Sequence, residues 1–469
     1  MPLVGAAVAL SVLHDLEARP WATIAVLALA VAAFAHALSR LGGERLPAPV
    51  VLGVALVLRL AVLPLPPTLS DDVYRYLWDG RIAAAGWNPY FHAPDDPALE
   101  GLRDELWRKV AHREVETVYP PLAIAAFSIA SRSSRPPLAW KAILTAVDLL
   151  SCLLLLRLAR ARGVPCGRCL AYAWNPLVVL EVSGMGHVDA LGLAPLLAGA
   201  LLLVERWRAG PSRELERAAD AAIARRRSLA AGGALGLAVL AKLVPVLVAP
   251  AWMRASPRRT LFAVACAGLV VVAALPFAPE APGLPPGLVT YAVSWEWNGP
   301  LFEPLWRALD SAGAAPWVKA RLGELEAVTG RPRLFDDVYP YVYPQLLAKS
   351  LLAVALAAVV LLSLRRADPI AAAHFVFAGM VLLSATVYPW YLLWVLPWAA
   401  LLWRVPWIVL SSTALASYLP RLLDVPLLPW PFLLVWAPFL IALLRARRTA
   451  SRSPTSAAPT AAGSGNGTL

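Results

Sequence analysis

The chain has 469 residues, of which 59% are hydrophobic and only 15% carry charge, so it has too few polar residues to cover the surface of a water-soluble protein of this length. Its formal net charge of +12 comes mainly from short basic clusters between apolar stretches, a pattern typical of cytoplasmic loops and not of nucleic-acid binding. The composition therefore predicts an all-α, polytopic membrane protein with about 11 to 14 transmembrane helices, some of them short or broken by proline.

Hydrophobic stretches begin at the amino end, residues 1–47. Residues 2–13 lack the basic start and the small-residue cleavage site of a signal peptide, so we expect a short membrane or interfacial helix there, followed by a helix over 21–41. We expect one main membrane domain over 48–446 and a disordered cytoplasmic tail over 447–469. Its membrane segments are expected at residues 48–66, 138–158, 169–183, 186–205, 229–253, 260–277, 343–364, 370–386, 390–403, 405–419 and 427–444.

Seven basic clusters predict the orientation, because Lys and Arg collect in cytoplasmic loops. They are Arg40 with Arg45, 157–168, 206–227, 254–259, Arg365 with Arg366, Arg404, and 445–448. All seven clusters face the cytoplasm if residues 119–131 do not cross the membrane and if residues 229–253 form a pair of short helices that meet at Lys242. Residues 67–137 and 278–342 are then large extracytoplasmic loops with helical content, and 184–189, 386–391 and the Lys242 turn lie on the same side.

The densest charge lies in the first of these loops, at residues 70–81, SDDVYRYLWDGR. Prolines end the preceding helix, and Ser70 is suited to cap the next one. On that next helix Asp72 and Tyr76 share a face, as do Arg75 and Asp79. An N-terminal capping cluster with an ordinary ion pair is one interpretation of this pattern.

A functional interpretation is favoured by position, because carboxylates at a membrane boundary tend to face cavities and substrate paths. The neighbouring carboxylates of Asp71 and Asp72, with an arginine nearby, suit a base that works at neutral pH. The same letters, DDVY, recur at 336–339 without the aromatic and glycine continuation. We interpret that second copy as part of a loop or an interfacial belt.

Other polar motifs lie at predicted helix ends: GWNPY at 86–90, VYPPL at 118–122, GHVD at 186–189, KLVP at 242–245 and TVYPWY at 386–391. His187 and Asp189 fit a structural pair as well as a ligand contact, and no third ligand supports a metal. The Cys166-Gly-Arg-Cys169 spacing lacks a second pair and does not support metal or redox chemistry. Lys242 fits a phosphate contact or a side chain that reaches the interface, and 386–391 fits a site wall or an aromatic belt.

The order of these motifs resembles that of the GT-C superfamily of integral-membrane glycosyltransferases. Within it the chain is most similar, over residues 48–403, to bacterial polyprenyl-phosphate-mannose dependent alpha-mannosyltransferases. The resemblance implies a lipid-phosphate sugar donor and an essential acid in the first extracytoplasmic loop, usually in an Asp-x-x-x-Tyr arrangement, which Asp72 and Tyr76 match. The amino end departs from that pattern, because two or three hydrophobic segments precede the loop instead of one.

The expected activity is transfer of a sugar, mannose by resemblance, from a polyprenyl phosphate to a glycan, lipid or protein acceptor. The reaction is expected on the extracytoplasmic side of a bacterial-type inner membrane, with inversion of the anomeric configuration. Asp72 is the expected base and Asp71 its partner. The expected partners are the lipid-linked donor, the acceptor and membrane lipids, with no nucleic acid. No cofactor and no metal are expected. Because the donor already has a leaving group, no nucleotide-binding fold or glycine-rich phosphate loop is needed. Expected donor and substrate contacts are Arg75, Arg81, Lys242, Tyr76, Trp78, Asp79, Asn88, Tyr90, Tyr119, His187, Asp189, Trp390 and Tyr391.

Two alternatives fit the same sequence. A polytopic lipid or sugar transporter, or flippase, would also use an intramembrane lysine and broken helices. A membrane ligase would transfer a glycan from a polyprenyl diphosphate. No clear internal repeat supports the transporter, and the polar motifs gather on one side, away from the midplane where alternating access places its site.

Overall fold

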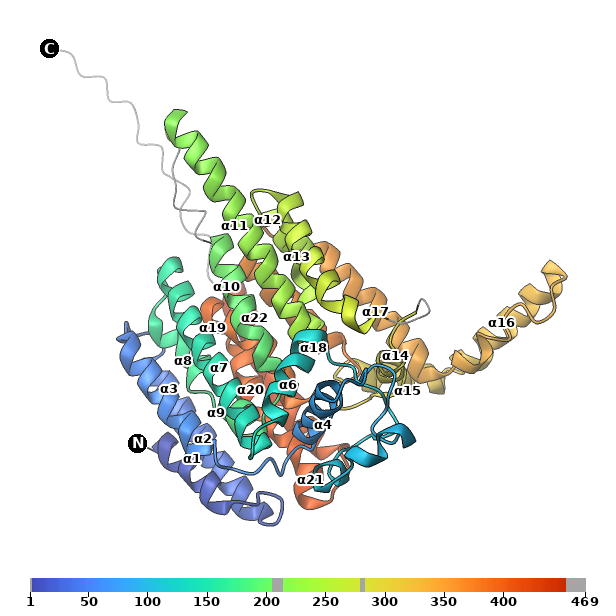
Figure 1. Ribbon diagram of the computed structural model, residues 1–469, viewed down its shortest axis with the longest axis horizontal. Helices are drawn as coiled ribbons and strands as arrows, with labels where there is room; N and C mark the ends of the chain where they lie inside the picture. Colours follow the sequence, from blue (N-terminus) through green and yellow to red (C-terminus); the bar gives the residue numbers. More distant parts are fainter. Residues whose placement is uncertain (1, 205–213, 279–282, 453–469) are drawn as a thin grey trace.

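The computed structural model describes residues 2–204, 214–278 and 283–452, and the regular structure of these residues is helical (Figure 1). The described residues contain no strand beyond isolated bridges from Trp297 and Asn298 to Thr386. The predicted all-α membrane fold is therefore confirmed. Most of the predicted tail, from residue 453 on, and the first part of the basic cluster 206–227, up to residue 213, lie outside the described residues.

Five helices of the described part are long and apolar enough to cross a membrane. They are α2 (Pro20–Leu41), α7 (Pro136–Arg162), α13 (Arg259–Ala274) with η6 (Leu275–Phe277), α17 (Pro344–Ser363) and α22 (Trp430–Arg452). Seven shorter apolar segments accompany them: α1 (Pro2–Leu13), α3 (Ala48–Val62), α6 (Pro121–Ser131), α9 (Pro176–Val179) with η3 (Leu180–Met185), α10 (Asp189–Val204), η5 (Val244–Val248) with α12 (Ala249–Ala255), and α18 (Pro369–Leu383). Three of these helices precede the first polar loop, as the amino-end stretches indicated.

Proline and glycine break several predicted segments into short pieces, because proline removes a backbone donor and glycine tolerates a left-handed conformation. The stretch 169–183 becomes η2 (Cys166–Cys169), α8 (Leu170–Ala173), α9 and η3. The stretch 229–253 becomes the end of α11 (Glu214–Ala241) followed by η5 and α12. The helix breaks at Lys242 as predicted, but α11 has 28 residues and is not one of a pair of short helices. The carboxyl-terminal pieces are η8 (Pro389–Trp394), α19 (Leu396–Leu402), α20 (Val405–Thr413), η9 (Ala414–Tyr418) and α21 (Leu419–Leu423).

The two large polar loops are mostly helical. The first contains α4 (Asp72–Ala84), η1 (Pro97–Leu102), α5 (Glu105–Arg108) and then α6. The second contains α14 (Pro286–Ser294), α15 (Phe302–Ser311), α16 (Ala314–Thr329) and η7 (Tyr339–Tyr341). The second DDVY copy leads into η7 and does not line the main cavity described below, in agreement with its interpretation as a loop.

The connections that carry basic clusters contact one another at one end of the molecule. The contacts are Gly167 to Glu44, Arg162 to Asp368, Arg254 to Leu364 and Arg168 to Trp403. The opposite end contains α4 and α21, far from α12 in Figure 1. The charge asymmetry read from the sequence is therefore an asymmetry between the two ends of the fold.

A fully buried ion pair ties the helices beneath the first polar loop together. Nε of Arg59 on α3 lies 2.5 Å from Oδ2 of Asp148 on α7, and neither side chain is exposed. The arginine also donates to the carbonyl of Ala173 on α8 at 2.8 Å, and the hydroxyl of Tyr172 donates to Asp148. Both charges are thus compensated, as buried charges must be in an apolar interior.

Candidate active site

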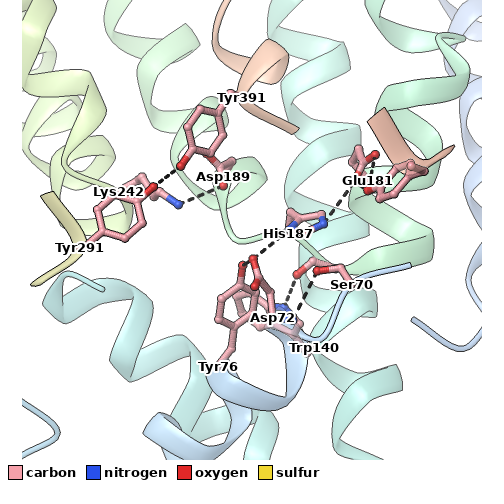
Figure 2. A network of polar contacts seen from close by, with 12 residues as sticks. Ser70, Asp72, Tyr76, Trp140, Glu181, His187, Asp189, Lys242, Tyr291 and Tyr391 are labelled. Carbon is pink, nitrogen blue, oxygen red and sulfur yellow. Dashed lines mark hydrogen bonds and ion pairs between the residues drawn. The ribbon is translucent and has the colours of Figure 1, made fainter. Parts of the chain in front are cut away.

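A cavity of about 640 Å³ lies where the first polar loop meets the Lys242 turn, α14, η8 and α21. Eight of the site residues predicted from the sequence line it: Asp71, Asp72, Arg75, Tyr119, Asp189, Lys242, Trp390 and Tyr391. His187 and Tyr76 contact one of these residues, Asp72, from behind (Figure 2). The fold thus brings together motifs that are more than 300 residues apart in the chain.

Asp72 is the first residue of α4, and its side chain is 39% exposed. Its Oδ2 accepts a hydrogen bond from the hydroxyl of Tyr76 at 3.1 Å and lies 3.5 Å from Nδ1 of His187. Burial raises the pKa of Asp72, but pairing with His187, the charge of Lys242 and the Tyr76 hydroxyl together lower it below the ordinary value. Asp72 is therefore an ionised carboxylate on the cavity wall at neutral pH.

Asp71 has a different partner from the one expected. Its carboxylate pairs with Arg421 of α21 at 3.2 Å, and this arginine also pairs with Glu17 at 3.4 Å. The nearest charged partner of Asp72 is His187, not Asp71, because Asp71 is the residue before α4 begins and its side chain is held by the arginine of α21. Asp71 still lines the cavity, beside Asp72.

His187 lies between two carboxylates (Figure 2). Its Nδ1 faces Asp72, and its Nε2 lies 3.2 Å from Oε2 of Glu181, with both His187 and Glu181 fully buried. The Tyr418 hydroxyl donates to Glu181 at 2.9 Å, and the ring of Trp390 stacks on the imidazole at 3.6 Å. Burial lowers the pKa of His187, but pairing with Asp72 and Glu181 outweighs burial and raises it to about 9.

Lys242 enters the cavity from the turn between α11 and η5. Its Nζ lies 3.3 Å from Oδ2 of the fully buried Asp189, whose other oxygen accepts from Nε1 of Trp394 at 2.6 Å. The ammonium lies 5.5 Å from the ring centre of Tyr119 and 5.9 Å from that of Tyr391. Because an ammonium has three donors and Asp189 takes one, Lys242 retains hydrogen-bonding capacity toward the cavity.

Arg75 is the second predicted cation on the cavity wall. Its Nε pairs with Oδ1 of Asp79 at 2.8 Å, one helical turn along α4, and its Nη1 donates to the carbonyl of His112 at 3.1 Å. Its Nη2 is buried and has no hydrogen-bond partner among the described residues. An unpaired buried donor is costly unless a ligand satisfies it.

Five predicted site residues lie away from the cavity. Arg81 pairs with Asp104 at 2.7 Å, and Trp78 is buried in a small apolar cluster with Ile82. The remaining three form contacts within the loop: Asp79 with Arg75, Asn88 with the backbone of Tyr90, and Tyr90 with the carbonyl of Tyr119. The structure therefore places these five residues in the framework of the first polar loop, because local partners hold their side chains there.

The sequence analysis did not single out several residues of the site. Glu181 is an isolated acid in an apolar stretch, and that isolation is the signal that could have found it. Tyr291, Trp297 and Tyr418 line the cavity, as does Tyr388 of the predicted motif 386–391, which stacks on the ring of Trp390 at 4.5 Å. Aromatic residues at membrane boundaries are common, so these gave no distinct signal. No group of three His, Cys, Asp or Glu side chains in the described part of the chain is arranged to hold a metal ion.

A family model described as Alpha-(1->6)-mannopyranosyltransferase, N-terminal domain, matches residues 2–258, more than half of the chain. Neither a search of curated proteins nor a search of solved structures found a significant match. The matched part includes Asp72, Glu181, His187 and Lys242. It ends before Tyr291 and the aromatic residues of η8.

Proposed function

The chain belongs to the alpha-(1->6)-mannopyranosyltransferase family, and from this premise we propose that it transfers mannose from a polyprenyl-phosphate donor to a glycan, lipid or protein acceptor at the extracytoplasmic face of the membrane. The family makes it a membrane mannosyltransferase, so the transporter interpretation is not retained. The donor and the side of the membrane are part of the proposal. The observation that carries it is an ionised Asp72 on the same cavity wall as the ammonium of Lys242.

Asp72 is the base in this proposal. Its carboxylate takes the proton of the acceptor hydroxyl while the hydroxyl oxygen forms a bond to the anomeric carbon of mannose. The bond between that carbon and the phosphate oxygen breaks, and the polyprenyl phosphate leaves with the electron pair. Direct displacement inverts the configuration, so a beta-linked donor yields an alpha linkage.

The leaving phosphate binds at the Lys242 side of the cavity. The ammonium there has donors to spare, and the hydroxyls of Tyr291 and Tyr391, which hydrogen-bond to each other, lie nearby on the same wall (Figure 2). The unpaired Nη2 of Arg75 supplies another donor. Charged donors of this kind stabilise the negative charge that develops on a departing phosphate.

The aromatic rings of Tyr388, just before η8, and of Trp390 and Tyr391 in η8 form the sugar and lipid platform. Tyr388 and Trp390 stack on each other, and Tyr391 meets Trp390 edge to face. Flat rings of this kind suit the apolar face of a pyranose or the first isoprene units of the lipid. Tyr119 borders this platform from the first polar loop.

The basic end of the fold faces the cytoplasm in our proposal, because Lys and Arg are enriched in cytoplasmic loops. The cavity, at the other end, is then extracytoplasmic. Single cysteines at Ser134 and Ala367, both exposed, test this in a variant whose native cysteines are replaced. A membrane-impermeant maleimide should label Ser134→Cys in intact cells and Ala367→Cys only after permeabilisation. The reverse pattern would overturn the orientation.

A reconstituted transfer assay tests the donor. Purified protein in liposomes receives polyprenyl-phosphate mannose, a polyprenyl-diphosphate-linked glycan or a nucleotide-linked mannose, each with a panel of glycan, lipid and peptide acceptors. We expect transfer, and release of polyprenyl phosphate, from the first donor alone. Transfer from the diphosphate instead would support the ligase alternative, and transfer from the nucleotide sugar would contradict both lipid-linked donors.

A further inference from the structure

The buried pair of Glu181 and His187 extends behind Asp72, away from the cavity. Glu181 does not line the cavity, yet its carboxylate is 3.2 Å from the imidazole whose opposite nitrogen faces Asp72. The three side chains come from α4, η3 and the turn before α10. A charged carboxylate with no access to solvent is costly, so its retention next to the site requires an explanation.

We propose that Glu181 is a positioning residue for transfer: through His187 it keeps the imidazole doubly protonated, and the imidazolium in turn holds Asp72 ionised and turned to the cavity. The inference rests on the proposed function only in calling Asp72 the base. It assigns no direct contact between Glu181 and either substrate.

The hydrogen-bonding capacity of the three groups supports this assignment. An ionised carboxylate only accepts hydrogen bonds, whereas a neutral imidazole donates from one nitrogen alone. Each nitrogen lies 3.2 to 3.5 Å from a carboxylate oxygen, in an ion pair without regular hydrogen-bond geometry. Both nitrogens can donate toward these carboxylates only when both carry protons. The set of two carboxylates and one imidazolium then carries a single negative charge, which suits a base that must accept one proton.

Local backbone structure makes the arrangement specific. Leu180–Met185 is a π-helix, a form that often marks functional sites. The backbone N–H groups of Gly186 and His187 both donate to the carbonyl of Glu181, at 3.0 and 2.9 Å. Gly186 has a φ of +82°, and an added Cβ would lie 3.1 Å from Lys141 and 3.3 Å from Trp140. Glycine therefore lets the chain turn back so that His187 faces Glu181.

The charged groups near His187 in the described part of the chain have partners of their own. Among the described residues, the titratable and charged side chains that these elements bring nearest to His187 and its two partners are Asp72 and Tyr76 of α4, Lys141 of α7, Glu181 of η3, Asp189 of α10, Lys242 before η5, Tyr391 of η8 and Tyr418 of η9. Of these, Lys141 is held by the carbonyls of Leu63 and Leu65, and Lys242 is held by Asp189. Both direct partners of the imidazole nitrogens are therefore carboxylates. This agrees with the raised pKa of about 9 for His187, where pairing outweighs burial.

The protonation of His187 is measurable without any substrate. Protein with isotope-labelled histidine is titrated by NMR in detergent, and the His187 signal is identified as the one missing from His187→Asn. We expect an imidazolium at pH 7 that titrates near pH 9 in the native chain. In Glu181→Gln, loss of the buried charge should lower that midpoint by about one to three pH units. Glu324→Gln, an exposed acid paired with Arg321, should leave it unchanged.

The activity profile gives a second measurement. If His187 must stay protonated, the alkaline limb of kcat in Glu181→Gln should move to lower pH by the same amount, with the KM for the donor unchanged. A structural role alone would lower kcat equally at all pH values. A neutral His187 at pH 7 in the native chain, or a midpoint that Glu181→Gln does not shift, would overturn the proposal. If Glu181→Gln does not fold, the titration of His187 in the native chain still tests the proposal, because a neutral His187 at pH 7 would overturn it. Absence of transfer from every donor would instead overturn the proposed function while leaving the NMR result intact.

Discussion

The hydroxyl of Tyr76 donates a 3.1 Å hydrogen bond to Oδ2 of Asp72, one helical turn earlier in α4. Tyr76 is itself fully buried and stacks on Phe127 at 4.9 Å, so its hydroxyl has a defined position. The tyrosine therefore fixes the carboxylate at the cavity wall. Burial and the Asp72 charge together hold the pKa of Tyr76 well above its usual range, so the tyrosine stays a donor at neutral and moderately alkaline pH.

Replacing the proposed base should abolish most of the activity. Asp72→Asn keeps the size of the side chain but removes its ability to take a proton, and general bases contribute about 10²- to 10⁴-fold to rates. We expect kcat to fall by that factor, measured as mannose transfer from polyprenyl-phosphate mannose. Asp337→Asn, at the same position of the second DDVY copy, is the matched control and should retain native activity. Full activity in Asp72→Asn would refute the assignment of the base.

Removing Lys242, the cation that we propose binds the donor phosphate, should weaken donor binding. Lys242→Met deletes charged hydrogen bonds worth about 1.5 to 3 kcal/mol, so we expect the KM for the lipid donor to rise about 10- to 100-fold. Lys242→Arg should recover part of the loss. Lys349→Met is a suitable control, because Lys349 also forms a partly buried ion pair, with Glu296 at 3.1 Å, but does not line the cavity. Equal effects of the Lys242 and Lys349 substitutions would contradict a phosphate contact.

The buried pair of Arg59 and Asp148 should matter for stability and not for chemistry. Asp148→Asn leaves the guanidinium uncompensated, and breaking a buried pair in this way costs about 3 to 5 kcal/mol. The double variant Arg59→Met with Asp148→Leu should be more stable than Asp148→Asn. Unfolding in detergent, followed by circular dichroism, measures both. Glu324→Gln, which breaks an exposed pair, should cost at most about 1 kcal/mol. A loss in Asp148→Asn as small as this would argue against a fully buried pair.

Close packing of α4 on α6 requires the absence of a side chain at Gly80. A Cβ there would lie 2.3 Å from the carbonyl carbon of Phe127 and 2.6 Å from the backbone nitrogen of Ser128. Backbone atoms cannot move aside without separating the helices, so Gly80→Ala should destabilise the protein by about 1 to 3 kcal/mol. It should also lower kcat, because α4 carries Asp72. Gly53→Ala in α3, where nothing lies within 4 Å, should be neutral or slightly stabilising. Similar melting temperatures for the two variants would contradict this packing.

Local features of the fold could be predicted from the sequence because they depend on neighbouring residues. The spacing of Asp72 and Tyr76 placed both on one face of a helix, and that geometry is confirmed. The break at Lys242 was predicted from the basic clusters, which share one side of the membrane only if the stretch 229–253 is interrupted there, and α11 indeed ends at Ala241. Charge clusters indicated which connections share one end of the fold.

The sequence did not predict which partner each polar side chain has. Asp71 pairs with Arg421, 350 residues away, and Glu181 accepts from Tyr418, 237 residues away. Arg81, expected at the phosphate, pairs instead with Asp104 of its own loop. Charge and hydrogen-bonding capacity in the sequence establish that such groups need partners, but several candidates satisfy each need equally well.

The sequence by itself thus determined the membrane-helical class, the breaks in the helices and the carboxylate of Asp72 that faces the cavity. Only the tertiary structure decided that His187 lies between this carboxylate and Glu181, and that the hydroxyls of Tyr291 and Tyr391 meet beside Lys242. The physical reason is the separation in sequence over which each kind of interaction acts. Helix periodicity and proline geometry act over a few residues, whereas the packing of helices distant in sequence selects which buried polar groups meet.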